Sequence, residues 1–583
     1  MKLSEQYEQL LTTFPHKTVK TTNKELAKVL YCSERHAKNI ITNLKKAGWI
    51  QWKSGSGRGN FSTLTLLYEY EDFITKIAEE MASTHSIDEA ISFIKSKPLN
   101  SIQKDRFIDW LFSNLITIED ELATNHADHL RFASYRPLPS LDPFDVNRRS
   151  ENHMMRHLFN QLVAYDERAQ RFLPEIAHTW KTCPNSKTWT FYLRKQVLFH
   201  NGDELTAEDV CFSFLRHNDS NSAYHWIMEA VDDVRAINRY TVMFTLRHPD
   251  PYFLTFVSSL GGSLIRMDQT NKPIGTGPFL IDVNNEDKLT LQANERYFGL
   301  RPLLDKVTMY FFPQVYETST IENIATEKKL NFYQYPNSVK ANLAYEENSI
   351  IDRGSKLLSV NMNRPIGQDF YLRSAINIAL SRTTMIQELK GNRHVPAYRM
   401  FSESEVKWNA SFVKAKEFLR KSQYDDTPLH LYSYVGAGNE KDGKWIQREL
   451  KKLGITVTLH FLPLKELHSL PLSQISDFLL GEQLSDENLH YTYLSAYFGS
   501  HSFMQYHLTN KWKSKLKQEL LSLPDEEAQL KKLRKMEESL CEQHALIYLY
   551  RLQQSAIYPN DLENIHLNAL GWVDYTKLWY RHH

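Results

Sequence analysis

The sequence has 583 residues, of which 42% are hydrophobic and 12% aromatic, and its formal net charge is +1. Such a composition favours a packed globular protein of about three or four domains and excludes a disordered chain. The near-zero charge also excludes a chain that binds nucleic acid along its whole length. The charge is uneven, because residues 1–60 hold eleven Lys and Arg against four Glu, an excess of +7, and the remainder sums to −6. We therefore expect any phosphate-binding surface in the N-terminal region.

Residues 22–48 have the pattern of a helix-turn-helix. Thr22 and Glu25 have the spacing of a capping box, which satisfies free backbone N–H groups where a first helix begins. Ser33 is placed to cap a second helix, and Gly48 is placed to end it in a left-handed conformation. The second helix has an apolar face for the domain core: Ala37, Ile40, Ile41 and Leu44.

The outer face of this second helix predicts contact with DNA. In a helix-turn-helix the second helix enters the major groove, where its first turns reach base edges. Arg pairs with guanine and Asn with adenine through two hydrogen bonds each. We expect the following residues to contact double-stranded promoter DNA: Ser33, Glu34, Arg35, His36, Lys38 and Asn39.

A β-hairpin is predicted directly after the helices. Trp49–Lys53 and Phe61–Leu67 have strand character, and the Gly-rich stretch Ser54–Asn60 joins them. A hairpin at this place makes a winged helix, whose tip can lay a cation along a phosphate or into the minor groove. Lys53 and Arg58 are therefore added to the predicted DNA contacts. A winged helix that mediates only protein contacts stays open as an alternative.

Residues 69–128 change in character and are predicted to be helical. Apolar residues recur at helical spacing from Phe73 to Met81 and again from Ile87 to Ile94. The stretch is acidic. It suits a helical coupler or a dimerisation element, and a plain spacer packed on the wing explains it equally well.

From Arg131 the chain becomes a mixture of short strands and helices. Trp189–Arg194 and Val197–His200 are predicted strands, Asn201 and Gly202 a turn, and Thr206 the cap of a helix. Several ionisable residues of this stretch could also be a metal cluster, but turn and cap chemistry accounts for most of them, and we predict no metal or cofactor. These residues are His200, Asp203, Glu204, Glu208 and Asp209.

This block resembles the solute-binding proteins of peptide-type ABC transporters, bacterial solute-binding family 5. The resemblance rests on Phe172–His217, "FLPEIAHTWKTCPNSKTWTFYLRKQVLFHNGDELTAEDVCFSFLRH", with the pattern Leu-Pro-x-Ile-Ala, Phe-His-Asn-Gly and Leu-Thr-Ala-Glu-Asp-Val. Pro273–Gly299 and Leu357–Arg382 follow as further family-like stretches. Within Pro273–Gly299, "GTGPF" lacks the ending of a phosphate loop and is interpreted as a strand entry near the second lobe.

The combination of the N-terminal winged helix with the family 5 block indicates a family more specifically than either part does alone. A winged helix joined to a family 5 module resembles the SgrR family of bacterial transcription regulators, and "WVDYTKLWY" at Trp572–Tyr580 is similar to the ending of that family. The resemblance implies a multidomain α/β protein with a winged helix (1–68), a helical coupler (69–128) and a two-lobed sensor like the class II periplasmic binding proteins (129–583). It implies a ligand-responsive transcription regulator and no enzyme.

The resemblance places a ligand in the cleft between two closing lobes. Candidate ligand residues are Tyr135 and Arg136 after the opening strand, Asn363 and Arg364 in "NMNRP", and Glu482. Peptide binders tend to grip the amino terminus of the ligand with an acidic group in a later D…G-W-x-x-D segment. In "SDFLLGEQLSDEN" the aromatic is missing and Asp486 is one place off, so a sugar or sugar phosphate is as plausible as a peptide. The oligomeric state stays open.

The four cysteines form no C-x-x-C pair, and they are expected to be reduced thiols. The start of the sequence has no apolar core of signal-peptide length, and no apolar run is long enough for a membrane span. We therefore expect a cytoplasmic protein with no membrane partner. Two alternatives stay open. The first is a cytoplasmic solute-binding or peptide-binding protein whose N-terminal winged helix is vestigial or binds protein. The second is a hydrolase. The sequence shows no G-x-S-x-G elbow for the latter.

Overall fold

A computed structural model describes residues 2–581 of the protein except 56–60, 85–86, 101–102, 105, 108–109, 112–127, 135, 146–147, 271, 312–344, 402–409, 524, 560 and 569–570. The chain divides into two compact units. The first lies within Met1–His126 and is called the head. The second begins at Ala127 and is called the body. Each unit is described by itself.

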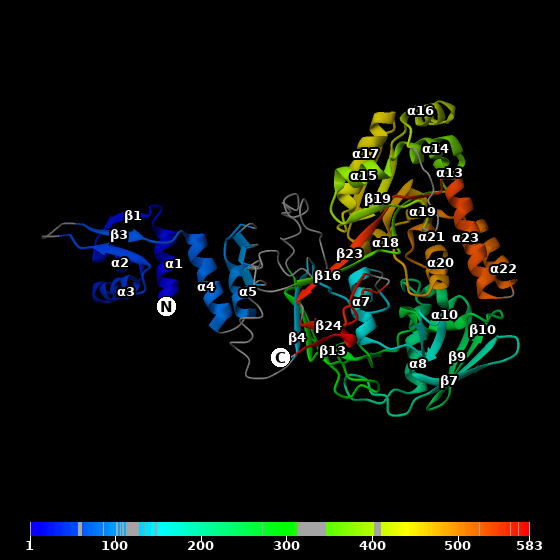
Figure 1. Ribbon diagram of the computed structural model, residues 1–583, viewed down its shortest axis with the longest axis horizontal. Coiled ribbons are helices and arrows are strands. Elements are labelled where there is room, and N and C mark those ends of the chain that lie inside the picture. The colour runs from blue at the N-terminus through cyan, green and yellow to red at the C-terminus, as the bar shows by residue number, and fades with distance from the viewer. Residues whose placement is uncertain are drawn as a thin grey trace. The chain divides into compact units, whose positions relative to one another are not determined.

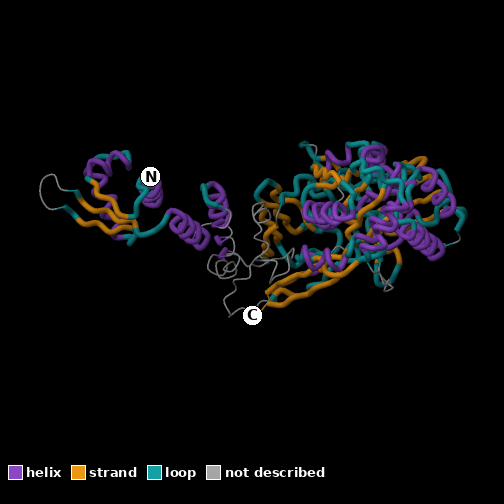
Figure 2. Tube along the Cα trace, turned by 90° about the horizontal axis from the view of Figure 1, so that it is seen from above, coloured by secondary structure: helices purple, strands orange, loops and turns teal. Residues whose placement is uncertain are grey.

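The head is a winged helix with a three-stranded antiparallel sheet. Its sheet has the order β1-β3-β2, and Figure 2 shows the three strands side by side. The elements follow one another as α1 (Leu3–Thr13), β1 (Thr18–Thr21), α2 (Asn23–Val29), α3 (Glu34–Lys46), β2 (Ile50–Lys53) and β3 (Ser62–Leu66). The predicted helix-turn-helix and hairpin are confirmed. The sequence analysis did not predict α1 or β1.

Tyr7 on α1 ties the head together. Its side chain is fully buried, and its hydroxyl accepts hydrogen bonds from the backbone N–H groups of Leu67 and Tyr68, both at 3.2 Å. Its ring packs on Trp49 and on Phe73, with ring centroids 5.6 Å and 4.5 Å away. Because Phe73 belongs to the next helix, the acidic helical segment packs on the winged helix.

That segment contains α4 (Tyr70–Thr84) and α5 (Ile87–Ser96), which pack against each other. Both bury the apolar faces that the sequence predicts. Since α4 also contacts α1, the expected division between a winged helix and a separate coupler after residue 68 stays a proposal.

The first lobe of the body contains two four-stranded sheets. One has the order β13-β14-β15-β4, in which β4 runs parallel to β15, and the other is antiparallel with the order β7-β8-β10-β9. Their strands are β4 (His129–Ser134), β7 (Ala177–Thr182), β8 (Thr188–Leu193), β9 (Val231–Asn238), β10 (Thr241–Leu246), β13 (Phe279–Asn284), β14 (Lys288–Ala293) and β15 (Lys306–Phe311). Short pairs are β5 (Val163–Asp166) with β6 (Arg171–Pro174), and β11 (Arg266–Met267) with β12 (Pro273–Ile274).

The helices of this lobe are short. Among its described residues, the longest is α7 (Arg149–Leu158), and the others are α8 (Ala207–Leu215), α9 (His225–Met228) and α10 (Phe253–Val257), with 3-10 turns η1 (Arg216–Asn218) and η2 (Leu260–Gly262). The capping box of α8 forms as predicted, between Thr206 and Asp209. The predicted strand Val197–His200 is wrong. Only an isolated bridge between Leu198 and Glu204 forms there, because the turn at Asn201 follows too closely for a regular pair.

The stretch "GTGPF" leads into β13, as expected of a strand entry, but its lobe was predicted wrongly. Phe279 opens β13, which belongs to the same sheet as β4 of the first lobe. Gly275 and Gly277 are required for packing, since a Cβ at either would lie within 2.6 Å of backbone atoms at the end of α7.

The second lobe is built on a five-stranded mixed sheet with the order β20-β19-β21-β17-β22. Helices α14, α15 and α17 cover one face and α18, α19 and α21 the other, as Figure 1 shows. The strands are β17 (Ser355–Val360), β19 (Leu429–Tyr434), β20 (Val457–Leu462), β21 (Phe478–Gln483) and β22 (Leu546–Tyr548). The helices are α13 (Pro365–Gln368), α14 (Phe370–Ala379), α15 (Arg382–Leu389), α16 (Phe412–Lys421), α17 (Asn439–Leu453), α18 (Leu464–Ser469), α19 (Leu472–Ile475) and α21 (Phe503–His507).

Two groups of elements join the lobes. Strand β23 (Tyr550–Pro559) pairs antiparallel with β16 (Tyr345–Ile351) and with β18 (Arg393–Pro396), and it runs from the second lobe toward the first (Figure 1). Helices α20 (Leu489–Phe498), α22 (Asn510–Leu521) and α23 (Glu526–Glu542) follow β21, and α20 contacts α10 of the first lobe.

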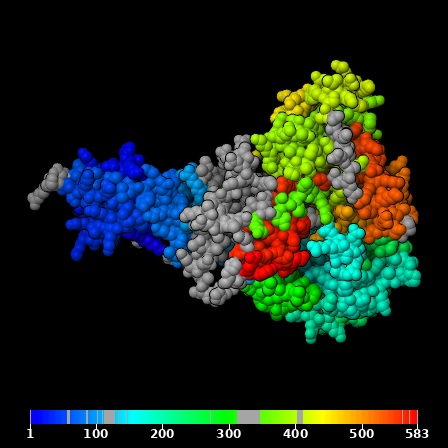
Figure 3. Space-filling model, in the orientation of Figure 1, coloured from blue at the N-terminus to red at the C-terminus, as the bar shows by residue number. Residues whose placement is uncertain are grey.

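The C-terminal segment returns to the first lobe. It contains β24 (Leu562–Glu563), the 3-10 turn η3 (Tyr575–Lys577) and β25 (Trp579–Tyr580). Figure 3 shows this segment in red against the first lobe. Among the described helices of both units, none combines the length and the apolar character needed to cross a membrane.

Candidate DNA-binding surface and ligand cavity

Helix α3 presents a polar face to solvent because its apolar residues are all taken by the head core. Ser33 caps its start, where the hydroxyl oxygen accepts the His36 N–H at 3.3 Å. Gly48 follows its end with φ +74°, in the left-handed region that glycine adopts without strain. The buried residues of α3 are the four that the sequence predicts: Ala37, Ile40, Ile41 and Leu44.

The predicted DNA contacts fall on this exposed surface. All six residues from Ser33 to Asn39 that were named as contacts are exposed, and Lys53 is exposed at the end of β2. Within the described part of the head, neither Arg35 nor Lys38 has an ion-pair partner, so both charges face solvent. Arg58 lies outside the described residues.

The body contains a cavity of about 110 Å³ between its lobes. Helix α7, the α9 segment and η2 of the first lobe form one side, and the ends of β19 and β21, α18, α20 and the start of α21 form the other. Tyr434 and Glu482 stand at the carboxyl ends of the parallel strands β19 and β21, where α/β sheets commonly bind ligands. The lining side chains used below are Asn152, Arg156, Tyr224, Trp226, Tyr434, His468, Glu482, Asp486, Tyr491, His501 and Phe503.

Two arginines of α7 bind carboxylates of the second lobe. Arg156 Nη2 lies 2.6 Å from Asp486 Oδ2, and its Nη1 lies 3.9 Å from Glu487 Oε2. Arg149 is almost completely buried and bonds to Asp352, which is 2% exposed, and its Nη2 lies 3.5 Å from Glu482 Oε2. These ion pairs connect the two lobes at the cavity.

Two histidines of the cavity wall are held neutral. The rings of His468 and His501 stack with centroids 4.3 Å apart. Burial, followed by the repulsion of His501 and of Arg148, lowers the pKa of His468 to about 3. Burial also lowers the pKa of His501. At neutral pH neither ring adds positive charge to the cavity.

The C-terminal segment packs against a neighbouring face of α7. The His153 ring stacks on Trp572 with centroids 4.6 Å apart, and the His157 ring stacks on Tyr575 at the same separation. The Tyr575 N–H donates a hydrogen bond to His157 Nε2 at 3.1 Å. One face of α7 is therefore fixed by this segment while an adjacent face lines the cavity.

Comparison with known proteins identifies the families. The sequence profile of the bacterial extracellular solute-binding proteins, family 5 (middle region), matches residues 171–505. The chain belongs to this family. A second profile, the N-terminal region of the sugar transport-related sRNA regulator, matches residues 2–109. Both resemblances inferred from the sequence are confirmed.

Two curated relatives match the chain over long stretches. The chain is 28% identical over 571 residues to the uncharacterized protein YhjP of Bacillus subtilis (strain 168), covering 96% of this chain and 95% of that protein. It is 30% identical over 322 residues to the HTH-type transcriptional regulator SgrR of Photorhabdus laumondii, covering 54% of this chain and 55% of that regulator. The chain thus matches about half the length of that regulator.

A solved family 5 structure shows the same fold. The periplasmic binding protein DppA of Helicobacter pylori, in complex with the peptide STSA, superposes with a TM-score of 0.65 at 21% identity. The match covers 78% of this chain and 98% of that chain. The predicted two-lobed α/β fold is confirmed.

The predicted ligand residues are not all brought together in this family 5 fold. Glu482 lines the cavity, and Tyr135 lies outside the described residues. Arg136 is bonded to Glu151 by two hydrogen bonds, one of them 2.7 Å long, and Glu151 is 5% exposed. Arg136 is not among the residues that line the cavity.

Asn363 and Arg364 also lie apart from the described cavity lining. Arg364 Nε donates to Asp477 Oδ1 at 2.7 Å, and Asn363 Nδ2 donates to Asn361 Oδ1 at 3.2 Å. Both side chains hold the start of the α13 segment against the neighbouring loop. Their roles in ligand binding, and that of Arg136, stay predictions.

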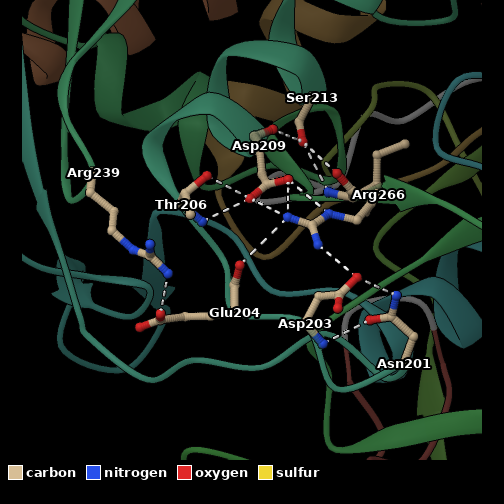
Figure 4. A network of polar contacts seen from close by, with 9 residues as sticks. Asn201, Asp203, Glu204, Thr206, Asp209, Ser213, Arg239 and Arg266 are labelled. Atoms are coloured by element: carbon tan, nitrogen blue, oxygen red, sulfur yellow. Dashed lines mark hydrogen bonds and ion pairs between the residues drawn. The ribbon is translucent and has the colours of Figure 1, made fainter.

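Three of the four carboxylates that could have suggested a metal cluster bind arginines. Arg266 binds Asp209 at 2.7 Å and Asp203 at 2.9 Å, and Arg239 binds Glu204 at 2.6 Å, as Figure 4 shows. The His200 ring makes a hydrogen bond with the Gly277 carbonyl at 3.1 Å. Among the described residues, no group of three or more potential ligands is arranged to hold a metal ion.

Sequence reasoning missed most of the cavity wall. Tyr224 fits there because Gly261 has no side chain, since a Cβ at Gly261 would lie 2.6 Å from the Tyr224 ring. The space beside Gly261 is filled by this ring. One feature of the sequence could have indicated this wall: Arg156 is a cation on the helix that begins at Arg149.

Proposed function

We propose that the protein is a ligand-responsive transcription regulator. The observation that carries the proposal is the combination, in one chain, of a winged helix with an exposed cationic face and a two-lobed module with a polar cavity between its lobes. The printed name of the SgrR relatives and the profile match to the head support it. The partners would be double-stranded promoter DNA and a small-molecule effector, and the compartment would be the cytoplasm, where bacterial promoters lie.

The head would bind DNA through α3 and the wing. Arg35 and Asn39 lie in the first two turns of α3, the part of a recognition helix that reaches base edges. Lys38 and Lys53 would contact phosphates, which fix the position of the protein without reading sequence. The wing residue Arg58 would act in the same way. An open cationic face of this kind weighs against a vestigial head.

The body would bind a small polar solute, such as a sugar, a sugar phosphate or a peptide, in the interlobe cavity. A ligand that contacts both walls stabilises the arrangement in which the lobes meet, and it shifts the population toward that arrangement. Arg156 and Glu482 come from opposite lobes, so one ligand could contact both. The matching families are families of binding and regulatory proteins, and we propose no catalytic step.

Coupling between the two sites is directly testable with the full chain. DNA fragments selected from a random pool by the protein provide the operator, and a metabolite screen by thermal shift provides the effector. The operator should change the dissociation constant of the effector by the factor with which the effector changes that of the operator, typically about 5- to 150-fold. If the protein selects no DNA sequence, or if neither ligand changes the affinity of the other, the proposal is wrong.

A further inference from the structure

We infer that the interlobe cavity selects a small organic cation with N–H donors, a primary amine or a guanidine, and rejects phosphorylated ligands. The inference rests on the proposed function and specifies the chemical class of its effector. It depends on how the charges of the cavity wall are paired, on which polar atoms there have no partner, and on the aromatic rings that surround them.

The cavity wall carries more negative than positive charge. Its charged side chains are Arg156, Glu482 and Asp486. Arg156 is already neutralised, because its guanidinium binds Asp486 at 2.6 Å and lies 3.9 Å from a second carboxylate, that of Glu487. A phosphate placed in this cavity would meet two carboxylates, Glu482 and Asp486, and one guanidinium that is already paired.

Glu482 is the carboxylate of the wall with the weaker ion pair, because it shares its cation with another carboxylate. Its side chain is 16% exposed, and Arg149 Nη2 lies 3.5 Å from its Oε2, too far for a strong charged hydrogen bond. Arg149 is bonded more closely to Asp352, so one guanidinium serves two carboxylates. A largely buried carboxylate whose charge is only partly paired is stabilised by a further cation, because burying an unpaired charge is unfavourable.

Lys356 lies opposite Glu482 in the sheet, but its Nζ lies 3.4 Å from Asp442 Oδ2. Two histidines and Arg148 do not supply a further cation either. The imidazoles of His468 and His501 face the cavity as neutral rings. The guanidinium of Arg148 lies over the ring of Tyr434, 5.4 Å from its centroid, and Arg148 does not belong to the described cavity lining.

The rest of the wall also suits an organic cation. Within the described structure, Asn152 Oδ1 is buried without a hydrogen-bond partner, and it can accept an N–H from a ligand. The rings of Tyr224, Trp226 and Tyr491 belong to the same wall. Aromatic faces attract cations and cover the apolar part of an amine or guanidine.

The arrangement differs from the one that the sequence resemblance implies for peptide binders. There, an acidic group of the later segment grips the amino terminus of the ligand. Here the nearest equivalent, Asp486, is bonded to Arg156 of the same chain. The carboxylate left for a ligand is Glu482, four residues earlier and near the end of β21.

Titration of the full-length protein tests the inference. Isothermal titration calorimetry would use three cations of increasing length (methylguanidine, putrescine and agmatine), with glucose as the neutral probe and glucose 6-phosphate as the anionic probe. We expect at least one cation to bind and glucose 6-phosphate to give no heat of binding. Glu482→Gln should weaken the bound cation about 10- to 100-fold, the range for a hydrogen bond to a charged group.

Two further variants keep the result interpretable. Glu466→Gln removes an exposed carboxylate of α18 outside the described cavity lining and should leave cation affinity unchanged. Glu482→Lys supplies a built-in cation, so it should abolish cation binding while the protein stays folded by circular dichroism. The inference is overturned if no cation binds at millimolar concentration, if Glu482→Gln binds as tightly as wild type, or if glucose 6-phosphate competes. A cation that binds without changing operator affinity would leave this inference standing and reject the proposed function.

Discussion

On α3 of the head, Arg35 and Lys38 are exposed, and among the described residues neither has an ion-pair partner. In the body, by contrast, several arginines bind carboxylates, for example Arg136 with Glu151 and Arg156 with Asp486. The same residue type thus serves two purposes. The two cations of α3 are left for an external anion, whereas these arginines of the body hold the protein together and shape a cavity.

The comparison explains why a count of basic residues locates the DNA-binding surface but not the ligand site. Exposed cations contribute their full charge to the field that a phosphate backbone meets. A cation that is paired with a carboxylate contributes little to this field. At a cavity, the charge that acts on a ligand is the net charge that remains after pairing. Four predictions test this contrast, and they run from the largest expected effect to the smallest.

Removing a paired cation of the body should have the largest effect. Arg149→Met would remove the guanidinium that is bonded to Asp352, a carboxylate that is only 2% exposed. We expect a loss of about 3–5 kcal/mol of unfolding free energy, measured by urea denaturation of the full chain. The control is Arg235→Met, because Arg235 pairs with Asp233 at 3.6 Å while both side chains are more than half exposed. That pair should contribute less than about 1 kcal/mol. Equal losses in the two variants would contradict the contrast.

The open cations of the head should make DNA binding strongly dependent on salt. Four to six phosphate contacts predict a log–log slope of about −4 to −5, which is a loss of roughly 250- to 1,000-fold between about 50 and 200 mM salt. Fluorescence anisotropy with the selected operator would measure it. Lys38→Ala should make the slope shallower by about one unit, and Lys416→Ala on α16 of the body should leave it unchanged. A flat salt response would place DNA affinity elsewhere.

Substitutions on α3 should change which DNA sequence is preferred, whereas a substitution in the wing should change the affinity for all sequences. Arg35→Ala should cost about 1–3 kcal/mol of operator binding and relax specificity at one base pair. Asn39→Ala should relax a different position. Arg58→Ala should weaken all sequences alike, because a phosphate contact carries no base information. Selection of DNA sequences by each variant provides the measurement. If Arg35→Ala and Arg58→Ala both weaken every sequence equally, bases are read by other residues.

Acid should weaken the body through its buried histidines. His507 is 1% exposed, its ring bonds to Ser359 and to Ser476, and burial lowers its pKa to about 3. In the unfolded chain its pKa returns to near 6.5, so the unfolded state gains a proton first as pH falls. Stability is therefore complete above about pH 6.5 and declines below it, by about 1.4 kcal/mol at pH 5.5 for this one group.

The melting temperature as a function of pH measures this decline. His507→Gln should make the decline between pH 7 and pH 5.5 shallower, while exposed His178→Gln should not alter it. A decline of the same steepness in His507→Gln and wild type would show that this histidine is not the cause.

The elements that sequence analysis predicted correctly are those specified by neighbouring residues. The caps at Thr22, Ser33 and Thr206 and the apolar periodicity of α3 act within a few residues, so they identify helices before any tertiary contact is known. The family resemblance supplied the two lobes. Helix α1 was missed because its main anchor, Tyr7, bonds to backbone groups 60 and 61 residues later.

The cavity could not be predicted in the same way. Arg156 meets Asp486 across 330 residues of sequence, and Arg364 meets Asp477 across 113. Both arginines were possible ligand residues by type, and only the fold shows that each has a carboxylate beside it. Glu482 was selected because it stands near the acidic position of a family pattern, and the fold places it at a strand end that faces the cavity.

The packing of Trp572 and Tyr575 on α7 has a consequence for the order in which the protein is made. The contact between Tyr575 and His157 spans 418 residues, which a bacterial ribosome takes roughly 20–80 s to translate. The head, in contrast, completes its contacts within the first hundred residues. During synthesis the DNA-binding domain is therefore complete tens of seconds before the sensor is complete. A ribosome that stalls in this interval would release a chain with its DNA-binding surface formed and one side of its effector cavity unsupported.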